Sequence, residues 1–368
     1  MPDGRLSAVR RRIQSVVDLY ATPLRAAHYV ELLNPLWSSR TLTARVEQVW
    51  DETADSRTIT LRPGRGWRRH RAGQHIRVGV AIDGRRFTRT YSISSSPERR
   101  DGCITITVKI LDDGRMSRHL VRHLRVGSHL PISLPQGDFV APESVPTRPL
   151  FVTGGSGVTP VMSILRTWAL IGNVPDAVHI HFAPHEHDVI FGTELSALAE
   201  THRRYQHHRV LTRAGNASPG EHHLTEALLD ERCPDWRSRE VWACGPQSLL
   251  DSMEALGAEA GVRVRLERFR AGVAELDEDA TGGAVTFLVP DADVVAVDAD
   301  ATTPLLRVAE DNGLNPDHGC RMGICHTCDV PLVAGQVRDL RTGQITDEAG
   351  TLVQICVSSA AGDCEIQL

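Results

Sequence analysis

The chain has 368 residues, of which 41% are hydrophobic and 24% charged, with a formal net charge of −5. This length allows two or three domains, each with its own hydrophobic core. No run of about 18 apolar residues occurs, which argues against a membrane-spanning helix, and no basic patch interleaved with aromatic residues indicates a nucleic-acid partner.

Residues 1–40 are predicted to form an extension before the first domain. Apolar residues recur at helical spacing from Leu6 to Tyr20, with Arg10–Arg12 on other faces, which predicts a short amphipathic helix. No apolar segment of the kind found in secretory signals follows these arginines, so we expect a cytoplasmic protein. The helix would pack on its own protein or touch a membrane surface, and the turn at Asn34–Trp37 ends the extension.

Residues 41–144 consist of short alternating runs separated by turns that contain Gly and Asp. Several short strands with such turns predict a small antiparallel β-barrel. The predicted strands are residues 43–49, 58–61, 75–80, 104–111 and 129–134.

Two motifs in this region have chemistry suited to a ligand with phosphates and a flat ring system. Arg89-Thr90-Tyr91-Ser92 combines a phosphate-binding arginine, a flat aromatic face and a hydroxyl that can reach a ring nitrogen. Gly114-Arg115-Met116-Ser117 opens a predicted helix through His123, and its free N–H groups favour a pyrophosphate. Either motif alone is equally consistent with an ordinary strand and an ordinary helix start.

Together the motifs resemble the ferredoxin–NADP reductase superfamily, whose barrel carries RxYS and GxxS for its flavin. The resemblance implies that Arg89 holds phosphate, Tyr91 stacks on the isoalloxazine and Ser92 approaches flavin N5. It also implies that the pyrophosphate is held by Gly114, Met116 and Ser117. Some relatives use FMN, but the GxxS helix start favours FAD.

Residues 145–270 alternate strands with helices, which predicts an α/β domain with a doubly wound parallel sheet. The predicted strands are residues 149–153, 178–182, 209–212, 240–243 and 262–267. One predicted helix follows the first strand and ends at Leu170, and three others span residues 193–200, 224–229 and 248–256. A glycine-rich turn after the first strand is where a dinucleotide pyrophosphate meets a helix N-terminus. Its GGxGxTP form resembles the same superfamily and implies nucleotide contacts from Gly154, Gly155, Gly157, Thr159 and Pro160.

Cys244-Gly245-Pro246 ends the fourth of these strands and resembles the nicotinamide-side loop of the superfamily. The resemblance implies that Cys244 lies beside nicotinamide C4, although a small buried cysteine before a turn is the alternative. Arg213 follows the third strand, where family members that accept NADPH often place a cation for the 2′-phosphate. No obvious carboxylate for ribose follows the second strand, so NADPH is favoured over NADH.

Residues 271–283 are charged and rich in turn formers, which predicts a linker. The segment after it, 284–368, carries a net charge of −9, and the preceding part carries +4. This asymmetry predicts electrostatic docking between the two parts. The tether would keep the C-terminal domain near the flavin while allowing it to reach an outside acceptor.

Cys320, Cys325 and Cys328, with the distant Cys356, have the spacing of a plant-type 2Fe-2S site. A four-cysteine zinc site is the main alternative, but zinc sites favour paired short-spaced cysteines. Disulfides are a weaker alternative, because the other cysteines are scattered and nothing marks the chain as secreted. Residues 284–368 resemble the plant-type ferredoxin family, which implies a β-grasp (α+β) fold and a one-electron carrier.

The three predicted domains in series imply an NAD(P)H:acceptor oxidoreductase in which FAD receives hydride and the 2Fe-2S cluster passes single electrons. The chain lacks a haem-thiolate signature, a Rieske pattern and histidine boxes, so the final acceptor is predicted to be another protein. The Asn34–Trp37 turn and the Cys320–Cys325 loop resemble actinobacterial reductases of membrane-bound fatty-acyl (stearoyl-CoA) desaturases. That resemblance implies a peripheral position at the inner membrane face.

Two alternatives for the function stay open at this point. One changes the acceptor to a Rieske oxygenase or a haem-thiolate monooxygenase. The other is a non-catalytic interaction protein whose cysteines hold zinc. Paired histidines are interpreted as solvated side chains rather than metal ligands: His119/His123, His185/His187, His207/His208 and His222/His223.

Overall fold

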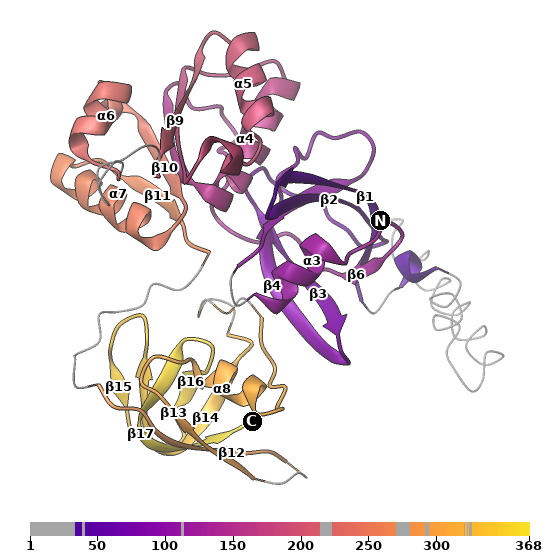
Figure 1. Cartoon of the computed structure of the whole chain (residues 1–368), viewed down its shortest axis with the longest axis vertical. Helices are drawn as coiled ribbons and strands as arrows, with labels where there is room; N and C mark the ends of the chain where they lie inside the picture. Colours follow the sequence, from indigo (N-terminus) through magenta and orange to yellow (C-terminus); the bar gives the residue numbers. More distant parts are fainter. Residues whose placement is uncertain are drawn as a thin grey trace, which may run out of the picture.

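In a computed structural model of the chain, the described residues are 34–38, 41–111, 114–213, 223–269, 280–290, 294–319, 321, 323 and 326–368. The predicted N-terminal helix and most of the predicted linker lie outside these residues. Three folded units follow one another along the chain (Figure 1): a purple β-barrel, a magenta-to-salmon α/β domain and a yellow C-terminal domain. Among the described helices, none is long and apolar enough to cross a bilayer.

The first unit is a barrel of antiparallel strands. Its elements are β1 (Thr43–Thr53), β2 (Ser56–Pro63), β3 (His75–Ile82), β4 (Arg85–Ser92), β5 (Ile104–Lys109), α3 (Arg115–Arg122) and β6 (His129–Pro131). One sheet has the order β5-β2-β1-β6, and β3 pairs with β4. Isolated bridges join the two, among them Ile93 to Ile106. The strand predicted to run to residue 134 ends at Pro131, and the following Ile132 forms an isolated bridge to Val78 of β3.

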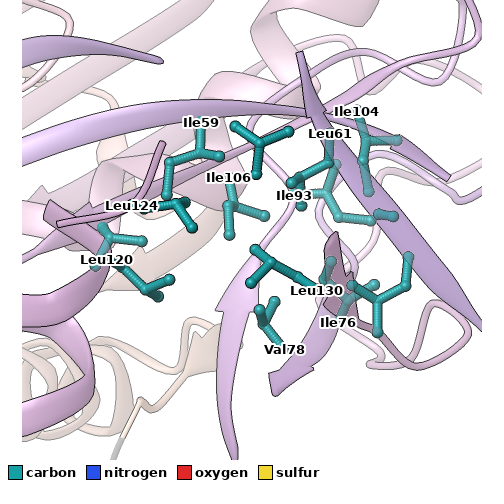
Figure 2. Close-up of a cluster of buried hydrophobic side chains, with 14 of the residues drawn as sticks. Ile59, Leu61, Ile76, Val78, Ile93, Ile104, Ile106, Leu120, Leu124 and Leu130 are labelled. Atoms are coloured by element: carbon teal, nitrogen blue, oxygen red, sulfur yellow. The ribbon is translucent and has the colours of Figure 1, made fainter. Parts of the chain in front are cut away.

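The alternating apolar residues of these strands fill the barrel interior. Figure 2 shows Ile59 and Leu61 of β2 close to Ile76 of β3, Ile106 of β5 and Ile93, which follows β4. Leu120 and Leu124, from α3 and the turn after it, close one end of this cluster. The barrel therefore has its own core, on which the RxYS strand β4 is mounted.

The second unit is a parallel sheet with helices on both faces. Its elements are β7 (Pro149–Gly154), α4 (Val158–Leu170), β8 (Ala177–Ala183), α5 (Gly192–Thr201), β9 (Tyr205–Leu211), α6 (Glu226–Arg232), β10 (Glu240–Cys244), α7 (Gln247–Ala260) and β11 (Val264–Glu267). The strand order is β11-β10-β7-β8-β9. Residues of α4 and α5 belong to one core cluster, and residues of α6 and α7 belong to another. The doubly wound sheet predicted from the alternation is confirmed.

One strand was misplaced by the sequence pattern. The prediction began it at Arg209, whereas β9 begins at Tyr205, which pairs with Ala177 of β8. Polar His207 and His208 lie within β9, so the local hydropathy gives no strand signal there. The pairing with β8 and the burial of Tyr205 define the strand instead.

Helix α4 connects the second unit to the barrel. The hydroxyl of Ser163 donates a hydrogen bond of 2.6 Å to the Ser95 carbonyl oxygen. Arg166 donates one of 2.8 Å to the Ser94 carbonyl oxygen. Because Ser94 and Ser95 follow directly after β4, these bonds place the glycine-rich turn before α4 beside the end of the RxYS strand.

The third unit has the β-grasp arrangement. Its elements are β12 (Gly283–Leu288), β13 (Val295–Ala299), α8 (Leu305–Asp311), β14 (Asp329–Asp339), β15 (Ile345–Thr346), β16 (Leu352–Gln354) and β17 (Ser358–Gln367). Strand β12 lies parallel to β17 and antiparallel to β13. Leu305 and Leu306 of α8 pack into the same core as Phe287.

Candidate functional site

Strand β4 places Arg89 and Tyr91 on one face and Ser92 on the other, because side chains alternate along a strand. Tyr91 pairs with Ile76 of β3 and packs against the barrel core, whereas Ser92 pairs with His75. Partners in an antiparallel pair share a face, so Ser92 and His75 point to the same side of the hairpin. That side faces the nucleotide unit, because His75 reaches Glu267 of β11.

The side chains of β4 fit a bound flavin nucleotide. Burial lowers the pKa of Arg89 to about 10, with the positive charge of Arg321 acting in the same direction. A buried cation of this kind is stabilised by an anionic partner such as phosphate. Within the described residues, the buried Ser92 Oγ has no hydrogen-bond partner, which suits a hydroxyl that meets a ligand.

The GxxS segment begins helix α3 as predicted. Gly114 is the N-cap, and no side chain caps the helix. The Ser117 hydroxyl donates to the Gly114 carbonyl oxygen at 3.0 Å and accepts from the Leu111 N–H at 3.2 Å. Met116 is 2% exposed and points into the barrel core. A pyrophosphate here would therefore meet backbone N–H groups of the first helical turn, and the Met116 side chain would not touch it.

The glycine-rich turn packs directly against the Cys244 loop. A Cβ on Gly157 would collide with the Cys244 carbonyl oxygen, and a Cβ on Gly154 would lie 2.7 Å from Pro246 Cδ. Gly155 has a φ of +51°, in the left-handed region that glycine adopts readily. These glycines let two loops from non-adjacent parts of the chain lie together at the carboxyl ends of β7 and β10, where α/β sheets bind ligands.

The remaining residues of the GGxGxTP motif organise the start of α4. The Thr159 hydroxyl donates to the Ser156 carbonyl oxygen at 2.8 Å, so it supports the turn rather than facing outward. Thr159 and Pro160 are both buried in the first turn of the helix. The N-cap Gly157 has no side chain, so no side chain covers the backbone at this helix start, where a pyrophosphate would lie.

Cys244 is fully buried at the end of β10. Burial, together with the nearby Glu267 carboxylate, raises the pKa of the Cys244 thiol well above its ordinary value. The group is therefore a neutral thiol at physiological pH, suited to packing rather than to nucleophilic attack.

The sequence motifs did not single out His75 or Glu267, whose side chains meet between the barrel and the nucleotide unit. His75 Nδ1 and Glu267 Oε1 are 3.4 Å apart, and both side chains are 15% exposed. Glu267 pairs with Cys244 across β10 and β11, and His75 pairs with Ser92 across β3 and β4. The sequence motifs included the neighbours of both residues, but only strand pairing between distant segments brings the two together.

Arg213, predicted to recognise a nucleotide phosphate, follows β9 at the carboxyl edge of the sheet. Its backbone N–H donates to the Pro184 carbonyl oxygen at 3.0 Å, and its side chain is exposed. Nearby, Glu186 forms an ion pair with Arg209 of β9. The carboxylate that follows β8 is thus already engaged by a cation.

The cysteine loop fits an iron–sulfur cluster in the part that the structure describes. Cys328 and Cys356 are buried in the ferredoxin core, and a hydrogen bond to Cys356 lowers the pKa of the Cys328 thiol. Arg321, Gly323 and His326 all have positive φ, a backbone pattern that can turn N–H groups toward a central anion. Cys320 and Cys325, the other two predicted ligands, lie outside the described residues.

A charged network supports this loop and extends toward the barrel. Arg321 forms an ion pair with Glu310 of α8 and approaches His318 Nε2 at 2.8 Å. Burial opposes ionisation of Glu310, but the Arg321 hydrogen bonds outweigh it, so the pKa of Glu310 lies below its ordinary value. Arg89 of the barrel also acts on Glu310 and His318 electrostatically. The cluster loop and the RxYS strand therefore share one electrostatic environment.

Comparisons with known proteins match all three units. Family models match an oxidoreductase FAD-binding domain at residues 51–140, an oxidoreductase NAD-binding domain at 151–255 and a 2Fe-2S iron-sulfur cluster binding domain at 289–360. An NADPH oxidoreductase of Mycobacterium tuberculosis is 42% identical over 97% of this chain and 92% of its own length. The chain belongs to the ferredoxin–NADP reductase-like family of oxidoreductases. Its cofactors are FAD, a 2Fe-2S cluster and NAD(P)H.

Two further relatives of this family member are reductase components. The glycine betaine monooxygenase reductase subunit of Pseudomonas aeruginosa is 32% identical, with 91% of this chain and 98% of the relative covered. The 3-ketosteroid-9-alpha-monooxygenase ferredoxin reductase component of Mycolicibacterium smegmatis is 29% identical, with 81% and 88% covered. Phthalate dioxygenase reductase has the same fold, with a TM-score of 0.63 at 22% identity over 89% of this chain and 98% of that structure.

These findings decide between several sequence-based alternatives. The multidomain fold and the oxidoreductase assignment are confirmed, and the interpretation as a zinc-holding interaction protein is wrong because the C-terminal segment matches a 2Fe-2S domain.

The interpretation of His207 as a solvated side chain is also wrong. Its ring lies 5.2 Å from that of the buried His179, and burial lowers its pKa to about 4.

Proposed function

We propose that the chain is the NADPH-dependent reductase component of a system in which a separate protein activates oxygen. The observation that carries this proposal is the packing of the Gly157 turn on the Cys244 loop, beside the barrel face that holds Ser92. When bound, FAD would supply hydride acceptance, which is a two-electron step. The 2Fe-2S cluster would supply one-electron transfer, so the two electrons would leave one at a time.

The residues of the chain supply binding and orientation. Arg89 would offset phosphate charge of the flavin nucleotide, and the glycine turn before Val158 would hold the pyrophosphate of the nicotinamide nucleotide. Ser92 offers an unpaired hydroxyl, and the buried, neutral Cys244 thiol packs beneath the loop against which the nicotinamide would lie. The buried seam between barrel and sheet excludes water from the reacting atoms.

We propose NADPH as the donor because Arg213 is exposed at the sheet edge, where the ribose of the nucleotide would lie. Stopped-flow reduction of the protein by NADPH and by NADH tests this directly. Arg213→Ala should weaken the apparent affinity for NADPH at least tenfold and leave the apparent affinity for NADH unchanged. Arg263→Ala is the matched control, since Arg263 precedes β11 at the opposite edge of the parallel sheet. Equal loss with both nucleotides would contradict a 2′-phosphate contact.

For the acceptor we propose an oxygenase component. The support comes from relatives whose names describe reductase subunits of monooxygenases that act on glycine betaine and on 3-ketosteroids. The C-terminal segment carries a net charge of −9, which favours docking on a basic face of the partner. Substrate-dependent NADPH oxidation with purified oxygenase components, suppressed by added salt, is the expected result.

A membrane-bound fatty-acyl desaturase is the second candidate acceptor. The turn η1 (Pro35–Trp37) is capped by Asn34, whose side chain accepts from the Leu36 N–H at 3.0 Å. Leu36 in turn accepts from the Arg65 N–H at 2.8 Å, which anchors the turn on the barrel. Trp37 is 49% exposed there, and an exposed tryptophan suits a membrane interface.

Reconstitution separates the two acceptor classes. The complete reductase is combined with desaturase-containing membranes or with an oxygenase, and double-bond formation or hydroxylated product is measured. NADPH-dependent desaturation that falls on Trp37→Ala, with vesicle co-sedimentation falling in parallel, would support the desaturase. If desaturase membranes form no double bonds while an oxygenase produces hydroxylated product, a desaturase acceptor would be excluded.

A further inference from the structure

His75 and Glu267 are in contact across the boundary between the barrel and the nucleotide domain. His75 begins β3 and Glu267 ends β11, and 3.4 Å separates His75 Nδ1 from Glu267 Oε1. Both side chains are largely buried. Each residue lies at the end of its strand that faces the other domain, so the contact spans the seam where nicotinamide and flavin would meet.

The imidazole of His75 is held in a fixed orientation. A Cβ on Gly137, whose φ is +104°, would lie 2.8 Å from the ring atoms Cε1 and Nδ1. The ring therefore lies against a backbone that has no side chain at this point. The His75 backbone also exchanges hydrogen bonds of 2.9 Å with Gln136, so the segment beneath the ring is tied to β3.

The same two residues are direct neighbours of the two predicted reaction residues. His75 is the cross-strand partner of Ser92, and Glu267 is the cross-strand partner of Cys244. The Glu267 carboxylate is close enough to Cys244 to contribute to the raised pKa of its thiol. A shift of Glu267 relative to His75 would thus change the distance between the Ser92 and Cys244 sides of the site.

Within the described residues, the contact leaves one nitrogen of the His75 ring without a hydrogen-bond partner. His75 Nδ1 is buried and makes no hydrogen bond, because its 3.4 Å approach to Glu267 has ion-pair distance but not hydrogen-bond geometry. A buried nitrogen without a partner is costly, whereas a small closing movement would convert this contact into a charge-assisted hydrogen bond.

We propose that His75 is a positioning residue for hydride transfer, acting through Glu267. Its ring holds β11, and with it the adjacent Cys244 loop, at a fixed distance from the barrel edge that carries Ser92. This inference rests on the proposed NADPH-dependent reductase function. Because reaction rates depend steeply on the separation of the reacting atoms, loosening this contact slows hydride transfer without removing either cofactor site.

The test compares His75→Gln, Glu267→Gln and the double variant in the complete, cofactor-loaded protein. His129→Gln is the matched control, an exposed histidine on β6 of the same barrel. Three quantities are measured: the flavin-to-protein ratio, the rate of flavin reduction at saturating NADPH, and deuterium uptake of residues 264–269. The isotope effect with 4-deuterated NADPH shows whether the rate reports hydride transfer.

We expect each single variant to retain its flavin. The flavin should be reduced about tenfold more slowly, with the isotope effect retained. Deuterium uptake at residues 264–269 should be faster than in the wild-type protein. The flavin-reduction rate of the double variant should be no lower than that of either single variant, because both substitutions remove the same contact. Multiplicative losses in the double variant, or unchanged exchange in His75→Gln, would overturn the proposal. Deuterium uptake needs no nucleotide, so it tests the contact even if wild-type protein fails to oxidise NADPH, the outcome that would refute the proposed function itself.

Discussion

Gly157 and Cys244 are in contact through their backbones, such that any side chain at position 157 would collide with the Cys244 carbonyl oxygen. The two residues come from the first and fourth strand–helix turns of the nucleotide domain. Their contact is what makes a pyrophosphate-binding turn and a nicotinamide-side loop parts of one site.

Gly157→Ala should therefore separate these loops. We expect the affinity for NADP⁺ to fall at least tenfold and the domain to lose about 1–3 kcal/mol of stability, because overpacking moves backbone as well as side chains. Difference-spectral titration with NADP⁺ measures the affinity. Gly79→Ala is the control, since its Cβ would meet Pro131 at an ordinary 3.4 Å. Unchanged binding in Gly157→Ala would show that the loops move independently.

Arg89 should determine flavin retention. Arg89→Ala removes a buried cation of strand β4, and we expect less than about a tenth of the wild-type flavin after gel filtration, because an unpaired phosphate charge is costly to bury. Arg89→Lys should retain an intermediate amount, since lysine keeps the charge but not the bidentate geometry. Arg86→Ala, an exposed position on the same strand, serves as control. Full flavin content in Arg89→Ala would exclude a phosphate contact.

Cys356 and Cys364 allow a matched comparison within the ferredoxin domain. Both are buried in its core, but only Cys356 approaches Cys328. Cys356→Ser should abolish the visible absorption of the cluster while NADPH still bleaches the flavin, so electron transfer to an acceptor protein stops. Cys364→Ala should keep the cluster and cost only packing energy. A cluster that survives in Cys356→Ser would require a different fourth ligand.

Buried His70 and His181 and half-buried His207 should make the protein acid-labile before its carboxylates titrate. Burial lowers the pKa of His70 and His207 to about 4 and that of His181 to about 3, from an ordinary 6.5. Between about pH 6.5 and 4 the unfolded chain then binds more protons than the folded one, so stability falls as pH falls. Urea midpoints should decrease from pH 7 to pH 5, and His207→Asn should flatten that slope. A constant midpoint over this interval would contradict neutral histidines in the folded state.

The sequence alone determined the order and type of the domains. Strand alternation predicted the barrel, the switch to alternating strands and helices predicted the parallel sheet, and the cysteine spacing predicted the cluster loop. These features are mostly local: strand patterns, glycine turns and the Cys320–Cys328 loop are each defined by residues close in the chain, and only the fourth cysteine, Cys356, is distant. The same local rule failed at β9, where polar His207 and His208 concealed a strand that pairing with β8 stabilises.

Only the tertiary structure decided which of these local pieces meet. The placement of His75 beside Ser92, and of Glu267 beside Cys244, depends on strand register, and their contact depends on how α4 seats the sheet against the barrel. Met116 shows the same point in reverse, because its side chain lies in the barrel core although it belongs to a cofactor motif. Pairing between distant segments is set by the summed packing of whole domains, and no local pattern of residue types encodes it.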